Sequence, residues 1–229
     1  MVMKIAVLGG TGDLGRGLVT RWAKFHEVIV GSRSEEKGRS LADEYRAIAE
    51  KHFGAELKGS IQGTENTKAA KASDVVVFTI PQEYLLEFLP TVKPFIDRQK
   101  ILISPVVPMR RVDKYFIYTP YLIGEPPRPL SAGEAISSIL ETDRVVSAFH
   151  SIPARKLAQL ELTLDYDVPL AGDDKDAVQV VSDLIKQIPN LKPLYAGPLS
   201  TSSLLESITP FLLNLSIYNK IKDPSIRVG

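Results

Sequence analysis

The chain has 229 residues, of which 44% are hydrophobic, and a formal net charge of +1. So small a net charge gives no sign of the basic surface that nucleic-acid-binding proteins or proteins of anionic membranes carry. Cysteine is absent, which excludes disulfides, thiolate nucleophiles and cysteine-ligated metals. No apolar run reaches the length of a membrane span, and the start of the chain does not look like a signal peptide. We therefore expect a cytoplasmic protein.

Apolar runs and helical patterns alternate along the first part of the chain. Strands are expected at 3–8, 26–31, 56–62, 74–81 and 100–105. Helices are expected at 12–25, 34–53, 64–72 and around 84–89. Such alternation is typical of a parallel sheet covered by helices on both faces. The predicted fold class is α/β, a Rossmann-type doubly wound parallel sheet with a second, smaller α/β domain.

The regular alternation ends in a proline-rich segment at 105–130, which we predict to be a long loop rather than part of the core. Loops of this length in compact domains are usually functional or mobile. A helix at 131–141 and a strand at 144–149 then close the first domain, residues 1–150. In residues 151–229 we expect strands at 167–172 and 193–197 and helices at 174–188 and 200–218. This second domain is too small for a large core of its own, so we expect it to pack on the first.

A glycine-rich turn after the first strand predicts a dinucleotide site. Gly10, Gly12 and Gly15 satisfy G-x-G-x-x-G between a strand and a helix, which is the context that this motif requires. The first glycine permits the tight turn, the second lets the backbone approach a pyrophosphate, and the third packs the helix on the strand. We expect four backbone amides to face the pyrophosphate at the helix N-terminus: those of Thr11, Gly12, Asp13 and Leu14.

The end of the second strand points to NADP rather than NAD. An acidic residue usually stands here and binds the adenosine ribose, but VIVG runs into Ser32 and Arg33, with Lys37 four residues later. A hydroxyl, a guanidinium fork and an ammonium group attract the 2′-phosphate of NADP, which a carboxylate would repel. The plainer interpretation is a solvated loop with surface charges. The position of Ser32 favours NADP.

Beyond these two motifs, the chain resembles one protein family from Leu8 to Asn214. The resembling segments are LGGTGDLGRGL, VIVGSRSEEK, DVVVFTIP, SPVVP, VVSAFHSIPA, DVPLAGDD and GPLSTSSLLESITPFLLN. They are similar to the NADP-dependent reductases of the 8-hydroxy-5-deazaflavin coenzyme F420, which occur in archaea and actinobacteria. One departure is the proline-rich YTPYLIGEPPRPLS at 118–131, which looks like an expansion.

The resemblance implies that NADP(H) lies across the carboxyl edge of the sheet, with the deazaflavin stacked on the nicotinamide in a cleft between the domains. It also implies further cofactor contacts: Pro81, Gln82 and Leu86 near the ribose, Met109 and Ala154 at the nicotinamide, and His150 and Ile152 at the deazaflavin ring. Judged from the residues alone, His150 could equally be a histidine at a strand end that is bonded to the backbone.

No other catalytic constellation is evident in the sequence. The histidines, His26, His52 and His150, lack metal-ligand spacing, and there is no nucleophile elbow. We therefore predict no metal site and no catalytic acid or base. Hydride transfer between two bound cofactors needs neither, since the cofactors carry the reaction. The expected function is hydride transfer between NADP(H) and coenzyme F420.

Two alternatives stay open at this point. An NADPH-dependent flavin or ferric reductase of the same fold could have an identical NADP half. A non-catalytic NADP-binding sensor could instead use the proline-rich segment and the apolar helix SLLESITPFLLNLSIY as a surface for a protein partner. That helix is explained equally well as a core helix or as the interface of a homodimer, and a homodimer is our expectation.

Overall fold

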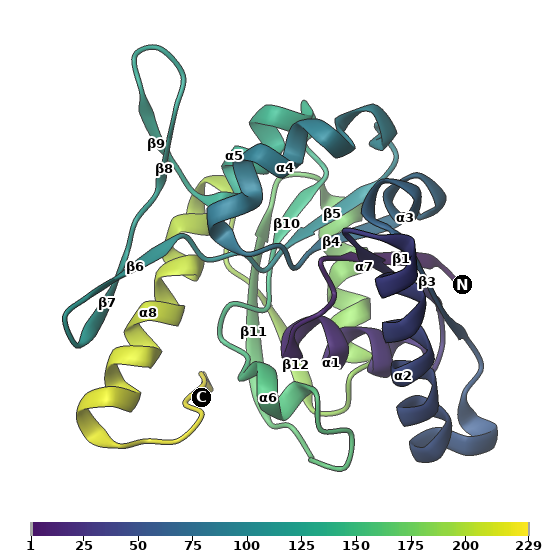
Figure 1. The fold of residues 1–229 in the computed structure, drawn as a ribbon. Helices are drawn as coiled ribbons and strands as arrows, with labels where there is room; N and C mark the ends of the chain where they lie inside the picture. The colour runs from purple at the N-terminus through teal and green to yellow at the C-terminus, as the bar shows by residue number, and fades with distance from the viewer. Residues whose placement is uncertain (1, 229) are drawn as a thin grey trace.

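A computed structural model describes residues 2–228 and contains one eight-stranded sheet (Figure 1). Its spatial order is β12-β11-β10-β5-β4-β1-β2-β3, and every neighbouring pair is parallel except β10 and β11. The strands are β1 (Lys4–Leu8), β2 (Glu27–Ser32), β3 (Ser60–Glu65), β4 (Val75–Phe78), β5 (Ile101–Ser104), β10 (Val145–Ser147), β11 (Tyr166–Gly172) and β12 (Leu191–Tyr195). The predicted α/β doubly wound sheet is confirmed, with one antiparallel pair that was not predicted.

Helices cover both faces of this sheet. They are α1 (Asp13–Trp22), α2 (Glu35–Phe53), α3 (Asn66–Ala72), α4 (Leu85–Val92), α5 (Ala132–Leu140), α6 (Ala154–Leu157), α7 (Lys175–Lys186) and α8 (Ser202–Asn219). Four single 3₁₀ turns accompany them: η1 (Gly54–Glu56), η2 (Gln82–Tyr84), η3 (Lys93–Phe95) and η4 (Leu199–Thr201). No helix within residues 2–228 is long and apolar enough to cross a membrane.

The strands are apolar on both faces because alternate side chains enter two different cores. Ile5 and Val7 of β1 pack in a cluster with side chains of α1, α2, α6 and α7. Ala6 and Leu8 of the same strand pack in a second cluster with α3, α4 and α5. Successive side chains of β1 therefore face opposite sides of the sheet, and each side is covered by helices.

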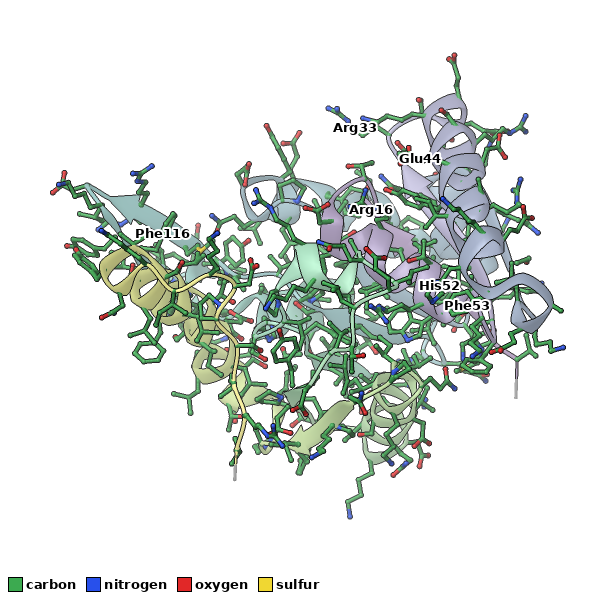
Figure 2. The ribbon with its side chains drawn as sticks, turned by 90° about the horizontal axis from the view of Figure 1, so that it is seen from below. Arg16, Arg33, Glu44, His52, Phe53 and Phe116 are labelled. Carbon is green, nitrogen blue, oxygen red and sulfur yellow. The ribbon has the colours of Figure 1, made fainter. Side chains whose placement is uncertain are left out.

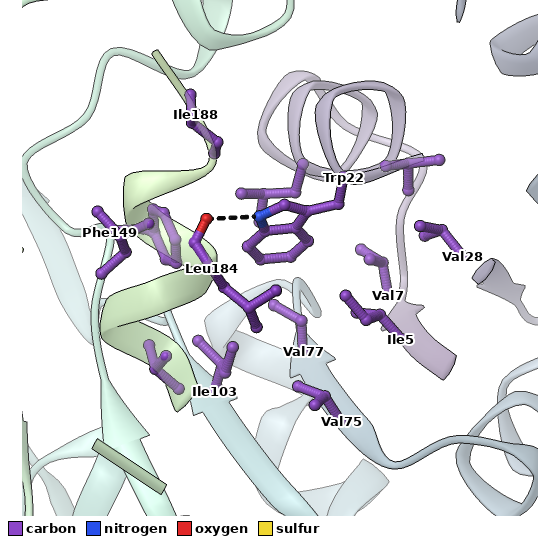
Figure 3. Close-up of a cluster of buried hydrophobic side chains, with 14 of the residues drawn as sticks. Ile5, Val7, Trp22, Val28, Val75, Val77, Ile103, Phe149, Leu184 and Ile188 are labelled. Carbon is purple, nitrogen blue, oxygen red and sulfur yellow. Dashed lines mark hydrogen bonds between the residues drawn. The ribbon is translucent and has the colours of Figure 1, made fainter. Parts of the chain in front are cut away.

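Trp22 joins the two halves of the chain within the first of these cores (Figure 3). Its indole Nε1 donates to the carbonyl of Leu184 at 3.0 Å, and its ring meets Phe149 edge to face at 5.8 Å. The expected boundary after residue 150 falls between β10 and α6, while the residues beyond it supply β11 and β12 to the common sheet. The division into two domains stays a prediction.

The proline-rich segment differs from the predicted loop, because it forms two β-hairpins that project from the body (Figure 1). β6 (Met109–Val112) pairs with β7 (Tyr115–Tyr118), and β8 (Tyr121–Ile123) pairs with β9 (Arg128–Leu130). Every strand of a two-stranded ribbon is an edge, so a proline such as Pro129 can sit where no ladder hydrogen bond is needed. The loop predicted from the prolines of this segment was therefore wrong.

Helix α8 anchors the first hairpin to the body. Asn214 accepts the amide of Phe116 at 2.7 Å and donates back to its carbonyl at 2.8 Å, and Figure 2 shows Phe116 beside this helix. Glu206, which is fully buried, accepts from the Tyr118 hydroxyl at 3.0 Å and from the amides of Ala132 and Gly133 at 3.0 and 3.1 Å. Burial raises the pKa of Glu206 to about 7, although these hydrogen bonds favour its charged form.

Candidate functional site

Three cavities follow one another along the carboxyl ends of the parallel strands, where doubly wound sheets bind ligands. The first, of about 460 Å³, adjoins the ends of β1, β2 and β4. The second, of about 410 Å³, adjoins β4 and β5, and the third, of about 430 Å³, follows β10. Ile80 and Pro81 line both the first and the second, and Thr209 lines both the second and the third. The cavities therefore form one continuous row.

The first cavity brings together the residues predicted to hold the 2′-phosphate. Ser32, Arg33 and Lys37 all line it, together with the predicted Thr11 and Pro81. Ser32 is 3% exposed at the end of β2, whereas Arg33 and Lys37 are exposed. Figure 2 shows Arg33 at the periphery of the molecule.

Neighbouring acids do not neutralise these two cations. Glu35, the acid nearest to Arg33 in the sequence, is bound by Arg39 and by Lys68 at 2.5 Å instead. The Lys68 ammonium, helped by Arg39, holds the pKa of the Glu35 carboxyl below its usual range. Within residues 2–228, neither Arg33 nor Lys37 forms an ion pair. Because α2 also begins here, its dipole adds to the attraction for a phosphate.

The glycine turn is built as its motif requires. A Cβ on Gly15 would lie 2.6 Å from the Cα of Gly10, so the start of α1 can pack against the turn only without a side chain. A Cβ on Gly12 would meet nothing within 4 Å. Gly12 and Gly15 both line the second cavity, together with Leu14. The space in front of Gly12 is thus open, beside the first turn of α1, whose amides have no acceptor within the helix.

Three residues of this turn are placed differently from the prediction that the motif lines a pyrophosphate site. The Thr11 amide donates to the carbonyl of Gly9 at 2.6 Å, so it is not free to face an anion in this structure. Asp13 lines the third cavity, and its carboxylate pairs with Arg16 at 3.0 Å. Gly10 is buried, and its carbonyl accepts from the Tyr45 hydroxyl at 3.0 Å. Gly10 therefore shapes the turn without lining any of the three cavities.

Gln82 and Met109 meet in the second cavity. The side-chain amide of Gln82 donates to the Met109 carbonyl at 2.5 Å and accepts from the Met109 amide. The Tyr121 hydroxyl donates to the Gln82 carbonyl at 2.7 Å. Gln82 therefore fixes the start of the first hairpin at the second cavity. Leu86, by contrast, is half-buried on α4 and lines none of the three cavities.

The third cavity is lined by His150, Ile152 and Ala154, as well as by Asp13. His150 is 7% exposed, and within the described chain neither ring nitrogen makes a hydrogen bond of normal geometry. Burial lowers the pKa of His150 to about 3, and the nearby backbone of Ser104 offsets this only in part. The imidazole is therefore neutral near pH 7, and its two nitrogens, one a donor and one an acceptor, are buried without a partner.

Sequence reasoning missed two polar residues of the row. Asn66 lines the first cavity, and its side-chain oxygen accepts the Gly9 amide at 3.1 Å, which supports the glycine turn. Thr209 donates to the His150 carbonyl at 2.6 Å. The asparagine opens α3 and the threonine precedes a proline inside α8. Neither context is a binding motif, so no local signal could have identified them.

The chemistry available in this row is binding and orientation. Within residues 2–228, no group of three His, Cys, Asp or Glu side chains could hold a metal ion. The row offers unpaired cations at one end, a glycine cradle in the middle and a neutral imidazole at the other end.

Comparisons with known proteins identify relatives of this chain. Residues 4–108 match the family described as NADP oxidoreductase, coenzyme F420-dependent. The F420-dependent NADP reductase of Methanocaldococcus jannaschii is 36% identical over 99% of this chain and 98% of its own length. The F420-dependent NADP reductase of Methanothermobacter thermautotrophicus is 35% identical over 100% of this chain and 95% of its own.

Solved structures share the fold. A candidate F420-dependent NADP reductase from Arthrobacter sp. FB24 is similar with a TM-score of 0.76 at 21% identity, over 99% of both chains. An imine reductase from Bacillus cereus has a TM-score of 0.59 at 14% identity, over 93% of this chain and 60% of its own. Since the relatives from methanogens are more than 30% identical over almost their full length, this chain belongs to the family of F420-dependent NADP reductases.

Proposed function

We propose that this chain transfers a hydride between NADP(H) and coenzyme F420 without a catalytic acid or base of its own. Membership of the F420-dependent NADP reductase family supports this function. The observation that carries the site assignment is the continuous row of three cavities, which ends in unpaired cations on one side and in a buried neutral histidine on the other.

NADP(H) would occupy the first two cavities. Ser32, Arg33 and Lys37 would bind the 2′-phosphate, since a guanidinium fork and an ammonium group complement a dianion. The amides of Gly12 and of the first turn of α1 would bind the pyrophosphate. Pro81 and Met109 would then flank the ribose and the nicotinamide in the second cavity. Gln82 would act through Met109, whose backbone it holds on both sides.

The deazaflavin would enter the third cavity. Ile152 would supply apolar contacts there, and Ala154, predicted to lie beside the nicotinamide, lines the same cavity. The ring of His150 would border the ligand, with its two unpartnered nitrogens buried behind the cavity surface. A buried imidazole without partners costs free energy, and a polar ring seated against it would remove that cost. The buried, unpartnered imidazole of His150 therefore favours a polar ligand in the third cavity.

Positioning is then the contribution of the protein. The two cofactors supply the electron pair and its acceptor, while the walls of the second and third cavities hold them in contact and exclude water. Thr209 contacts both cavities and is bonded to the His150 backbone. Thr209 would thus hold the loop that carries His150 in a fixed position relative to the second cavity, which would receive the nicotinamide.

Isotope transfer tests this function directly. NADPH carrying deuterium at C4 should deliver the label to C5 of the reduced deazaflavin without exchange with water, since no protein group takes up the hydride. Loss of the label to solvent would contradict direct transfer. Reduction of FMN without turnover of the deazaflavin would point to a flavin reductase, and no oxidation of NADPH with either acceptor would point to a sensor.

We also propose a homodimer in the cytoplasm. Exposed apolar side chains gather on α8, where Leu204 is 68%, Phe211 60% and Tyr218 64% exposed, and Leu122 on the adjoining hairpins is 69% exposed. Exposed apolar surface of this kind is typical of contact sites. Sedimentation equilibrium should give twice the mass of the chain, and Phe211→Ser should shift the protein toward monomer. A monomeric wild type at micromolar concentration would contradict the dimer.

A further inference from the structure

The C-terminal segment, residues 223–228, lies against the third cavity. Asp223 and Pro224 are part of its lining, although they are more than 60 residues away in the sequence from the loop after β10 that also lines it. The segment follows α8 and returns toward the sheet (Figure 1). One wall of the cavity therefore comes from a part of the chain with no regular secondary structure.

A series of hydrogen bonds fixes this segment. The Asp167 amide donates to the Ile226 carbonyl at 3.1 Å, and the Asp167 carboxylate accepts the Val228 amide at 2.5 Å. Arg227 forms an ion pair with Asp165. These contacts attach the end of the chain to the start of β11.

One further hydrogen bond reaches the loop that carries His150. The hydroxyl of Ser225 donates to the backbone carbonyl of Ser151 at 2.7 Å. Ser151 is 3% exposed, so its carbonyl has little access to water if Ser225 is removed. Thr209 makes the corresponding bond to the carbonyl of His150 at 2.6 Å.

The loop depends on such bonds because it leaves the sheet abruptly. Phe149 has a φ of +73°, a left-handed conformation that a bulky residue adopts only when its surroundings impose it. Ala148 still donates its amide to the Ser104 carbonyl of β5 at 3.1 Å, but residues 149–153 belong to no strand, since β10 ends at Ser147. Side-chain donors from α8 and from the C-terminal segment therefore replace the missing strand.

We infer that the C-terminal segment is part of the acceptor's binding site, with Ser225 positioning the His150–Pro153 loop and Pro224 forming an apolar wall. This inference rests on the proposed function, because it assigns the third cavity to the deazaflavin. It adds a residue that acts on the second substrate alone, since the segment lines neither of the two cavities assigned to NADP(H).

The test compares Ser225→Ala with Ser182→Ala in the full-length protein. Ser182 is the matched control, because its hydroxyl also donates to a backbone carbonyl, that of Val178 at 2.8 Å, but on α7. Ser225→Ala should raise the KM for the deazaflavin about three- to tenfold, the range expected from the loss of one hydrogen bond. Its Kd for NADPH should stay within about twofold of the wild type, and Ser225→Thr, which keeps the hydroxyl, should restore the KM.

Equal losses for both substrates would overturn the inference, since they would indicate a general loss of stability. An unchanged KM for the deazaflavin would overturn it as well. Hydrogen exchange of residues 149–157 gives a readout that needs no substrate. Exchange there should be faster in Ser225→Ala than in Ser182→Ala, with the glycine turn unchanged. If the wild type does not turn over the deazaflavin, the proposed function fails, while the exchange result still decides whether Ser225 holds the loop.

Discussion

The two ends of the cavity row differ in how their walls are built. At the first cavity, Arg33 and Lys37 are exposed cations on a loop and have no ion pair within residues 2–228. At the third, His150 is buried, uncharged near pH 7 and held through its backbone by Thr209. One end therefore offers exposed charge, and the other offers a buried neutral ring.

Because of this difference, we expect substitutions at different kinds of residue to affect the two ends. A site built from exposed charges depends on the charged side chains themselves and on ionic strength, because solvent screens such interactions. A site built from a loop held in a left-handed turn depends on distant residues that hold the backbone. Arg21 of α1 is such a residue, since its guanidinium donates to the carbonyls of Leu157 and Gln159, both at 2.8 Å.

The largest effect is expected from Arg21→Met. Arg21 is 8% exposed, and its loss removes two charge-assisted bonds. The Leu157 carbonyl loses this donor, while the Gln159 carbonyl keeps the Leu162 amide at 3.2 Å. The free energy of unfolding should fall by about 3 kcal/mol or more in urea titrations. The KM for the deazaflavin should rise more than the Kd for NADPH. Arg39→Ala, which removes an exposed ion pair, should cost less than about 1 kcal/mol. Equal losses of stability in the two variants would show that the bonds from Arg21 to the α6 region contribute no more than an exposed ion pair.

Arg33→Ala should have the next largest effect, confined to the other end. Losing one charged hydrogen bond of about 1.5–3 kcal/mol weakens NADPH binding roughly tenfold to over a hundredfold. Binding of NADH, which lacks the 2′-phosphate, should hardly change. Calorimetric titration of both nucleotides checks this. A wild type that binds NADH and NADPH equally well would refute the charge-based interpretation of the first cavity.

Lowering the pH should reduce the stability of the folded protein through the buried His150. The pKa of His150 is about 3 in the folded protein, against an ordinary value of 6.5. The unfolded chain therefore binds more protons between these values, so the free energy of unfolding falls as the pH drops below about 6.5. From about pH 7.5 to about pH 5, this contribution reaches at most about 2 kcal/mol.

His150→Asn isolates that contribution in urea titrations at the two pH values. The variant should lose less stability on acidification than the wild type. His26, whose pKa is also lowered, chiefly by burial, is present in both proteins and cancels in the comparison. An identical loss in wild type and variant would mean that His150 reaches solvent.

The smallest effect is expected from Lys37→Ala. Lys37 is an exposed point charge, and such interactions contribute about 1 kcal/mol or less. NADPH binding should weaken about two- to fivefold at low salt, and less at high salt. Lys51→Ala, at the other end of α2, is the control and should leave the Kd unchanged. A loss as large as that of Arg33→Ala would place the phosphate nearer to the helix than we propose.

The sequence by itself determined the features that depend on consecutive residues. The glycine turn, the hydroxyl and two cations after β2, and the caps at Ser34, Ser131 and Asp174 are all local chemistry. The apolar strands were equally legible, because burial on both faces requires an unbroken apolar run. The α/β class and the preference for NADP could therefore be predicted before any contact was known.

Only the tertiary structure decided which distant groups meet. Asn66 supports Gly9 across 57 residues, Thr209 holds His150 across 59, and Ser225 holds Ser151 across 74. The hairpins at 109–130 and the antiparallel β10–β11 pair likewise depend on pairing that prolines and periodicity do not specify. The physical reason is that a hydrogen bond or a cavity wall requires proximity in space, and the folded sheet creates that proximity between residues whose local patterns carry no mark of it.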